Sequence, residues 1–351
     1  MRIEERYCIE TKIGEGAQSV VFSARCRQSG LAVAVKHIKP TPNHTGRDRI
    51  VPISKLGANF REIAILQRLR STGQMHANIV DLIEVIFDEH SVYIVMNHCG
   101  INLSEYIARC RSCDVLFRPA GTSRTSRPTS PMVSVHLIQS IMRQVISAMT
   151  FVHSQFILHR DLKPQNIFVQ FADDQVIVKV GDFGLSKALT VPIPPETLNV
   201  ASLWYRAPEV LLQSGYDVGI DLWSLGCILV ELGQGSPLFL DSCEFGLLMK
   251  IFQTLGTPSK DVWGALGRSP NASIKWPQWN REKCLTRFRS YVTNLLGASG
   301  CELVLAFLKY ESNERIRCQE ALVHPFLRLG PDSDDGDDIG DLSDRLSDLN
   351  V

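Results

Sequence analysis

Residues 159–166 read H-R-D-L-K-P-Q-N, a short run that holds an aspartate, a lysine and an asparagine. Downstream, residues 181–185 read G-D-F-G-L and residues 204–209 read W-Y-R-A-P-E. Upstream, residues 33–36 read V-A-V-K. Each motif is short enough to occur by chance, but their order and spacing together indicate a single functional site.

Around these motifs the sequence changes from a strand pattern to a helix pattern. Residues 7–39 and 79–96 hold short apolar runs punctuated by turn residues, which is typical of strands. Residues 54–70 have helical periodicity, a longer helical stripe covers residues 135–152, and residues 210–329 are mainly helical. We therefore predict an α+β fold with a β-rich first lobe, a helical second lobe and a ligand-binding crevice between them.

One carboxylate falls on the apolar stripe of the helix predicted for residues 54–70. Glu62 shares a helix face with Ile65, Leu66 and Leu69, at spacings of three, four and seven residues. A carboxylate that is buried on such a face needs a cationic partner.

Composition limits the classes of function. The 351 residues carry no net charge, but residues 331–351 hold eight Asp and one Arg, so the other 330 carry a net charge of +7. The acidic end is poor in large apolar groups and is predicted to be disordered. The basic excess is too dilute to predict nucleic-acid binding, and no apolar run reaches the ~18 residues of a membrane span. Scattered cysteines and the lack of a signal peptide predict an intracellular protein of the nucleus, the cytoplasm or both.

Together the motifs resemble those of eukaryotic protein kinases, over residues 7–329. The resemblance implies the bilobal protein kinase fold, with the β-rich lobe as N-lobe and the helical lobe as C-lobe. Its implied divisions are an N-terminal extension (1–6), the N-lobe and hinge (7–99), the C-lobe (100–329) with a Ser/Arg/Pro-rich insertion (118–131), and an acidic disordered tail (330–351).

The resemblance also implies phosphoryl transfer from ATP with Mg²⁺. Lys36 would bind the α- and β-phosphates, and Glu62 would hold Lys36 by an ion pair, which gives the buried carboxylate its partner. Asp182 and Asn166 would ligate Mg²⁺, because hard cations prefer oxygen ligands.

On the acceptor side, Asp161 would accept the proton of the substrate hydroxyl. Lys163 would neutralise the phosphoryl group in transit, as in serine/threonine kinases.

Residues 14–22, G-E-G-A-Q-S-V-V-F, match the phosphate-binding loop of this family, with Ser19 in place of a third glycine. Gly14 and Gly16 would let the backbone approach the phosphates. Ala17 and Gln18 stand where many cell-cycle kinases carry a Thr-Tyr pair whose phosphorylation is inhibitory. Neither residue can be phosphorylated by a conventional kinase, so the enzyme should escape that inhibition. Met96 is the gatekeeper and Asn97 to Cys99 form the hinge. The ATP-contacting residues implied by the resemblance are Ile13, Gly14, Glu15, Gly16, Ala17, Val21, Ala34, Lys36, Val80, Met96, Asn97, Cys99 and Phe168.

Thr197 lies 15 residues after Asp182 and nine before Arg206, the spacing of the activating threonine of cyclin-dependent kinases. A phosphate there needs a basic cradle. The matching positions are Arg61, Arg160 and Lys187. Arg206 is the residue that favours proline after the phosphorylated Ser or Thr in this group, and Ser202 keeps the hydroxyl of the usual P+1 threonine.

Residues 218–228, 248–258 and 321–326 also resemble the cyclin-dependent branch. The implied function is proline-directed Ser/Thr phosphorylation in cell-cycle or transcription control. Its partners would be substrates with Ser/Thr-Pro sites, a cyclin-like activator and an upstream activating kinase. Residues 56–62, however, read L-G-A-N-F-R-E where the family has P-S-T-A-I-R-E. Two alternatives therefore stay open: a cyclin-independent kinase that activates other kinases, and a pseudokinase scaffold.

Within the implied C-lobe, Asp221 would brace the backbone of the catalytic loop. Glu209 would form an ion pair with Arg315.

Overall fold

The structure is a computed structural model, and its chain divides into two compact units. The first unit comprises Met1–Gly100 and Lys179–Ser186, and the second comprises Ile101–Val178 and Lys187–Val351. The residues that the structure describes are 2–16, 19–38, 41–42, 49–50, 53–71, 73, 75–88, 91–117, 131–172, 175–188, 203–259, 261–264, 266 and 274–328.

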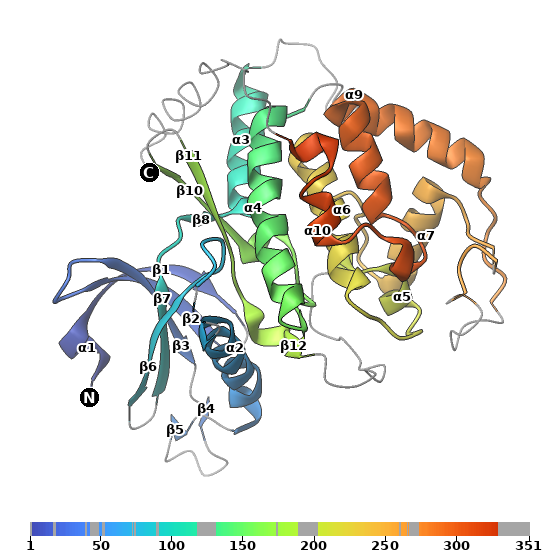
Figure 1. The fold of residues 1–351 in the computed structure, drawn as a ribbon. Coiled ribbons are helices and arrows are strands. Elements are labelled where there is room, and N and C mark those ends of the chain that lie inside the picture. Colours follow the sequence, from blue (N-terminus) through green and yellow to red (C-terminus); the bar gives the residue numbers. More distant parts are fainter. Residues whose placement is uncertain are drawn as a thin grey trace. The chain divides into compact units, whose positions relative to one another are not determined.

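An antiparallel five-stranded sheet forms the main part of the first unit, with the strand order β1-β2-β3-β7-β6 (Figure 1). Its strands are β1 (Tyr7–Glu15), β2 (Ser19–Cys26), β3 (Ala32–Ile38), β6 (Leu82–Asp88) and β7 (Ser91–Asn97). The same unit contains α1 (Ile3–Arg6), the two-stranded β4 (Thr41–Pro42) and β5 (Arg49–Ile50), α2 (Ile53–Ser71) and the 3₁₀ helix η2 (Phe183–Leu185).

A hydrophobic cluster of the first unit includes residues from α1 as well as from the sheet. Ile3 and Tyr7 pack there with Val35, Ile86 and Val95. Ile3 is 3% exposed, although it lies in the segment predicted as an N-terminal extension. The first residues of the chain therefore contribute apolar burial to this unit.

Helix α2 begins and ends within one residue of the helix predicted for residues 54–70. Glu62, Ile65, Leu66 and Leu69 are all buried, as the periodicity indicates. Glu62 is thus a buried carboxylate, and its environment is described with the site below.

The second unit is mainly helical (Figure 1). Its α-helices are α3 (Leu103–Phe117), α4 (Val135–Ser154), α5 (Pro208–Leu211), α6 (Gly219–Gln234), α7 (Glu244–Leu255), α9 (Arg281–Phe307) and α10 (Cys318–Ala321). Short strands are β8 (Ile101–Asn102), β9 (Ile157–Leu158), β10 (Ile167–Ala172), β11 (Gln175–Val180, which ends in the first unit) and β12 (Lys187–Ala188). The 3₁₀ helices are η1 (Pro164–Asn166), η3 (Leu203–Tyr205), η4 (Ser312–Glu314) and η5 (Pro325–Leu327).

Helix α6 is the centre of the second unit. Every residue of α6 is buried, and the helix packs against α4 and α9. Polar side chains on such a helix must find partners inside the protein. Helix α9 is bent at Gly297, whose φ of 76° and ψ of 174° favour glycine.

A β-rich unit and a helical unit confirm the predicted α+β class. Among the described residues, no helix has the length and apolar character needed to cross a bilayer. The glycine-loop residues Ala17 and Gln18 lie outside the described residues, as do Thr197, Ser202, residues 118–130 of the predicted insertion, and the predicted tail.

Candidate active site

Lys36, Glu62 and Asp182 gather in the first unit. Lys36 stands on β3, between Val21 of β2 and Ile94 of β7 in the sheet register. Its Nζ lies 2.6 Å from Oε2 of Glu62 and 3.9 Å from Oδ1 of Asp182. Burial alone would lower the pKa of Lys36, but the two carboxylates outweigh it and raise this pKa. Lys36 is therefore held as a cation, ready to bind anionic oxygens.

Asp182 adopts an uncommon backbone conformation at the start of η2. Its φ of 60° and ψ of 70° place it in the left-handed region. Phe183, the next residue, is fully buried, whereas the side chain of Asp182 is 45% exposed. Arg61 of α2 donates to the carbonyl of Gly184 at 3.3 Å. The turn thus anchors Phe183 and leaves the Asp182 carboxylate accessible to a cation.

The catalytic-loop motif forms a second cluster, in the second unit. Nζ of Lys163 lies 2.7 Å from Oδ2 of Asp161. Nδ2 of Asn166 donates to the Asp161 carbonyl at 2.8 Å and to Oδ2 at 3.1 Å. These contacts orient the Asp161 carboxylate. Because the amide nitrogen of Asn166 is engaged in them, its amide oxygen is the group that fits a metal ion.

The resemblance to protein kinases implies a metal ion, and carboxylate and amide oxygens such as those of Asp182 and Asn166 suit a hard divalent cation such as Mg²⁺. Within the described ranges, no three His, Cys, Asp or Glu side chains gather as they would in a zinc-type centre. The assignment of Asp182 and Asn166 as ligands of such a cation stays a prediction.

Asp221 of α6 holds the backbone of the loop, as predicted. Its Oδ2 accepts from the His159 amide at 2.9 Å, and its Oδ1 accepts from the Arg160 amide at 2.9 Å. His153 of α4 places Nε2 3.0 Å from Oδ2. Burial would raise the pKa of Asp221, but the hydrogen bonds and charges of His153 and His159 outweigh it and lower this pKa. An anionic Asp221 thus stabilises Arg160 at its positive φ of 67°.

Glu209 and Arg315 form the predicted ion pair. Nη1 and Nη2 of Arg315 lie 2.6 Å and 2.8 Å from the two carboxylate oxygens of Glu209. The Arg315 side chain is fully buried, and its guanidinium lies 5.1 Å from the centre of the Trp223 ring. This bidentate pair ties the end of the W-Y-R-A-P-E motif to the segment before α10.

Tyr205, from the same motif, bonds to a buried acid. Its hydroxyl donates to Oε2 of Glu231 at 2.7 Å. Burial raises the pKa of Glu231 to about 7, although the Tyr205 hydrogen bond and the charge of Arg111 act in the opposite direction. The residues on either side of Tyr205 contact the beginning of α7 and the segment before it. Trp204 donates to the Asp241 carbonyl at 2.9 Å, and Arg206 pairs with Glu244 at 2.7 Å.

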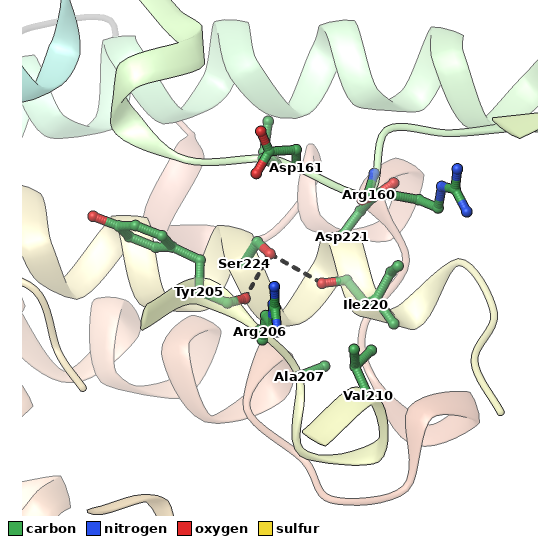
Figure 2. Close-up of a pocket in the computed structure, with 10 residues that line it drawn as sticks. Arg160, Asp161, Tyr205, Arg206, Ala207, Val210, Ile220, Asp221 and Ser224 are labelled. Atoms are coloured by element: carbon green, nitrogen blue, oxygen red, sulfur yellow. Dashed lines mark hydrogen bonds between the residues drawn. The ribbon is translucent and has the colours of Figure 1, made fainter. Parts of the chain in front are cut away.

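A small cavity of about 20 Å³ lies where the catalytic loop, the W-Y-R-A-P-E motif and α6 meet (Figure 2). Asp161 and Arg206 both line it. Figure 2 shows the Ser224 hydroxyl bonded to the carbonyls of Tyr205 and Ile220, at 2.9 Å and 3.1 Å. The sequence-distant motifs therefore share one local structure around Asp161.

The residues predicted to contact ATP fall in both units. Phe168 stands on β10 of the second unit, and the others lie in the first. Gly16 donates to the carbonyl of Ser19 at 2.8 Å and so closes the glycine loop. Met96 is paired with Ala34 in the sheet.

In the predicted hinge, Cys99 donates its thiol to the Asn97 carbonyl at 3.2 Å. Burial raises the pKa of this thiol to about 11.

The three residues of the predicted phosphate cradle are also distributed over both units. Arg61 belongs to the first, and Arg160 and Lys187 belong to the second. Arg160 donates to the Tyr216 hydroxyl at 2.9 Å, and Lys187 is paired with Leu158 in the β9–β12 ladder. Their assignment as a cradle for phosphorylated Thr197 stays a prediction.

Sequence reasoning missed the partners Tyr205, Glu231 and Glu244. Glu231 gave a signal, since it directly follows the mainly apolar run from residue 222 to residue 230 and is itself followed by Leu232. A carboxylate that is buried at the end of such a run needs a hydrogen-bond donor inside the protein. Tyr205 stands 26 residues away, and no local pattern joins the two residues.

Comparison with known proteins also relates the chain to protein kinases. Residues 7–327 match the family model described as "Protein kinase domain". Over 331 residues the chain is 36% identical to a protein of Trypanosoma brucei brucei named "Cell division control protein 2 homolog 1", and the alignment covers 92% of this chain and 98% of that protein. With these matches along its length, and with its motifs intact, the chain belongs to the protein kinase domain family.

Proposed function

We propose that the protein transfers the γ-phosphoryl group of ATP to serine or threonine hydroxyls that are followed by proline. The observation that carries this proposal is the set of contacts around its two functional clusters. Lys36 is paired with Glu62 in one, and Asp161 is held by Lys163 and Asn166 in the other. A scaffold that had lost catalysis would not need both sets.

On the nucleotide side, Lys36 would bind phosphate oxygens while Glu62 fixes its position. When bound, Mg²⁺ supplies neutralisation of the phosphate charge, and Asp182 and Asn166 would hold it. Gly14 and Gly16 would present backbone amides to the phosphates.

On the acceptor side, Asp161 would orient the substrate hydroxyl and accept its proton. Its carboxylate is 8% exposed and anchored by Lys163 and Asn166, so it is positioned before a substrate binds. Lys163 would stabilise the negative charge on the phosphoryl group as it transfers.

The activity is tested with Mg-ATP and a Ser-Pro peptide. Asp161→Asn and Lys36→Met should each lower kcat/KM by at least about a hundredfold. Asp261→Asn, which removes an exposed carboxylate, is the matched control and should change it little. No phosphate transfer by the wild-type chain, purified with any partner from its native cell, would favour the scaffold alternative.

We further propose a protein activator of the cyclin class. Phe60 of α2 is 45% exposed and Phe87 of β6 is 60% exposed, and large exposed aromatics are typical of protein interfaces. Phe60 lies two residues from Glu62, so a partner that binds there could fix the helix that carries Glu62. Similarity to a cell division control protein supports this class of partner.

The activator is tested by purifying the tagged chain without any companion protein. Full activity in that state would favour the alternative of a cyclin-independent kinase. Activity that appears only on addition of the partner, or after phosphorylation of Thr197 by an upstream kinase, would support control of the cyclin-dependent type.

A further inference from the structure

The first residue of α7 and the segment just before the helix are joined to the W-Y-R segment by two contacts of its side chains. Nε1 of Trp204 donates to the Asp241 carbonyl, and Nη1 of Arg206 lies 2.7 Å from Oε1 of Glu244. The Arg206 side chain is 10% exposed and that of Glu244 is 48% exposed. A nearly buried guanidinium is thus paired with a carboxylate that solvent can reach.

The position of Glu244 is fixed by the way in which α7 begins. Glu244 is the first residue of the helix, and the preceding Cys243 caps it by accepting from the Gly246 amide at 3.3 Å. Oδ1 of Asp241 accepts in turn from the Cys243 amide at 3.2 Å. A carboxylate in the first turn is also favoured by the helix dipole. Glu244 therefore meets Arg206 from a constrained backbone.

Arg206 contacts Glu244 and also lies near the catalytic loop. It lines the same small cavity as Asp161 (Figure 2). Arg206 is thus a close neighbour of Asp161, the residue that is proposed to orient the acceptor hydroxyl.

We propose that Glu244 is a positioning residue that sets, through Arg206, the preference for the substrate residue after the phosphorylated Ser or Thr. This inference rests on the proposed proline-directed activity. Glu244 holds the guanidinium in one orientation and supplies a negative charge beside it. A guanidinium fixed in this way has no acceptor for a backbone N–H, so it favours proline, which lacks that N–H. Glu244 also disfavours an acidic residue, which would otherwise be attracted to the arginine.

The test measures kcat/KM on three peptides that differ only in the residue after the acceptor serine: proline, alanine or glutamate. In Glu244→Gln, the proline-to-alanine ratio should fall by about two- to fivefold, because the lost ion pair is half exposed. The glutamate-to-alanine ratio should rise by a similar factor. Since each ratio is taken within one preparation, a loss of folded protein cancels.

The matched control is Glu282→Gln, which removes an exposed carboxylate from the first turn of α9. Both of its ratios should equal those of the wild type. A wild type that prefers proline, together with a Glu244→Gln variant in which either ratio stays unchanged, would overturn the inference. A wild type that does not distinguish proline from alanine would instead overturn the proposed proline-directed function.

Discussion

Buried carboxylates lie in and around the motifs, and they differ in the kind of group that they contact. Glu62 faces Lys36, Glu209 faces Arg315, and Asp221 accepts amide and imidazole N–H groups. Glu231 instead accepts from a phenol and has its pKa raised to about 7. The pKa values of Asp221 and Glu231 therefore move in opposite directions, because hydrogen bonds and charges outweigh burial at Asp221 but not at Glu231.

Stability should depend on pH through Glu231. Its pKa is about 7 in the folded chain, against a reference value of 4.5, so the folded state binds more protons between these values. The contribution of Glu231 to folding stability is fully present below about pH 4.5 and is lost as pH rises through about 7, to a total of about 3 kcal/mol. Urea unfolding should show that the free energy of unfolding falls less between pH 5 and pH 8 in Glu231→Gln than in the wild type. An equal loss in both proteins would contradict the raised pKa.

Glu62→Gln should destabilise the first unit, since it leaves the charge of Lys36 partly buried beside a neutral amide. Breaking one side of such a pair costs about 3 kcal/mol. The matched control is Glu10→Gln, at an exposed pair with Arg25, where the expected loss is below about 1 kcal/mol. Denaturant unfolding compares the two variants, and similar losses would show that burial of the Lys36 pair contributes nothing extra.

Among the elements, α2 could be predicted from the sequence almost to the residue, because its apolar stripe is local. The same stripe showed that Glu62 needs a cation, and the family motifs implied Lys36. The contacts of α6 and α7 with the W-Y-R-A-P-E motif could not be predicted from the sequence. Glu231 and Glu244 meet Tyr205 and Arg206 across 26 and 38 residues, and such pairings depend on tertiary packing rather than on periodicity. The left-handed backbone conformation of Asp182 could not be predicted for the same reason.

The tie between α5 and the segment before α10 should depend on the forked geometry of Arg315. Arg315→Lys keeps the charge but loses the bidentate contact with Glu209 and the contact with the Trp223 ring, so we expect a loss of about 3 kcal/mol. Arg317→Lys, at an exposed position nearby, is the control and should stay within about 0.5 kcal/mol of the wild type. Equal unfolding midpoints for both variants would show that charge alone suffices at residue 315.

At the scale of the whole molecule, the motifs that are proposed to act on nucleotide and acceptor are divided between the two units. Lys36, Glu62 and Asp182 belong to one, and Asp161 and Asn166 belong to the other. The proposed catalysis would therefore draw on residues of both units, and the proposed activator would engage α2 of the first.

Phe60→Ala with Phe87→Ala should weaken capture of the proposed activator by at least about tenfold, since buried aromatics dominate interface energies. The paired control is Phe156→Ala with Val323→Ala, which removes exposed apolar groups from the second unit. Pull-down and titration with the purified partner measure the effect. Unchanged capture by the first pair of substitutions would place the interface elsewhere.

The burial of Ile3 has a practical consequence for recombinant work on this chain. The family match begins at residue 7, which invites a truncation at that point. Such a cut would delete Ile3 from the cluster around Tyr7 and would also remove the Arg6–Glu84 ion pair. Newly exposed apolar surface on a sheet promotes aggregation during expression. The boundary of a family match is thus not the boundary of the folded unit, and a soluble fragment should retain its first six residues.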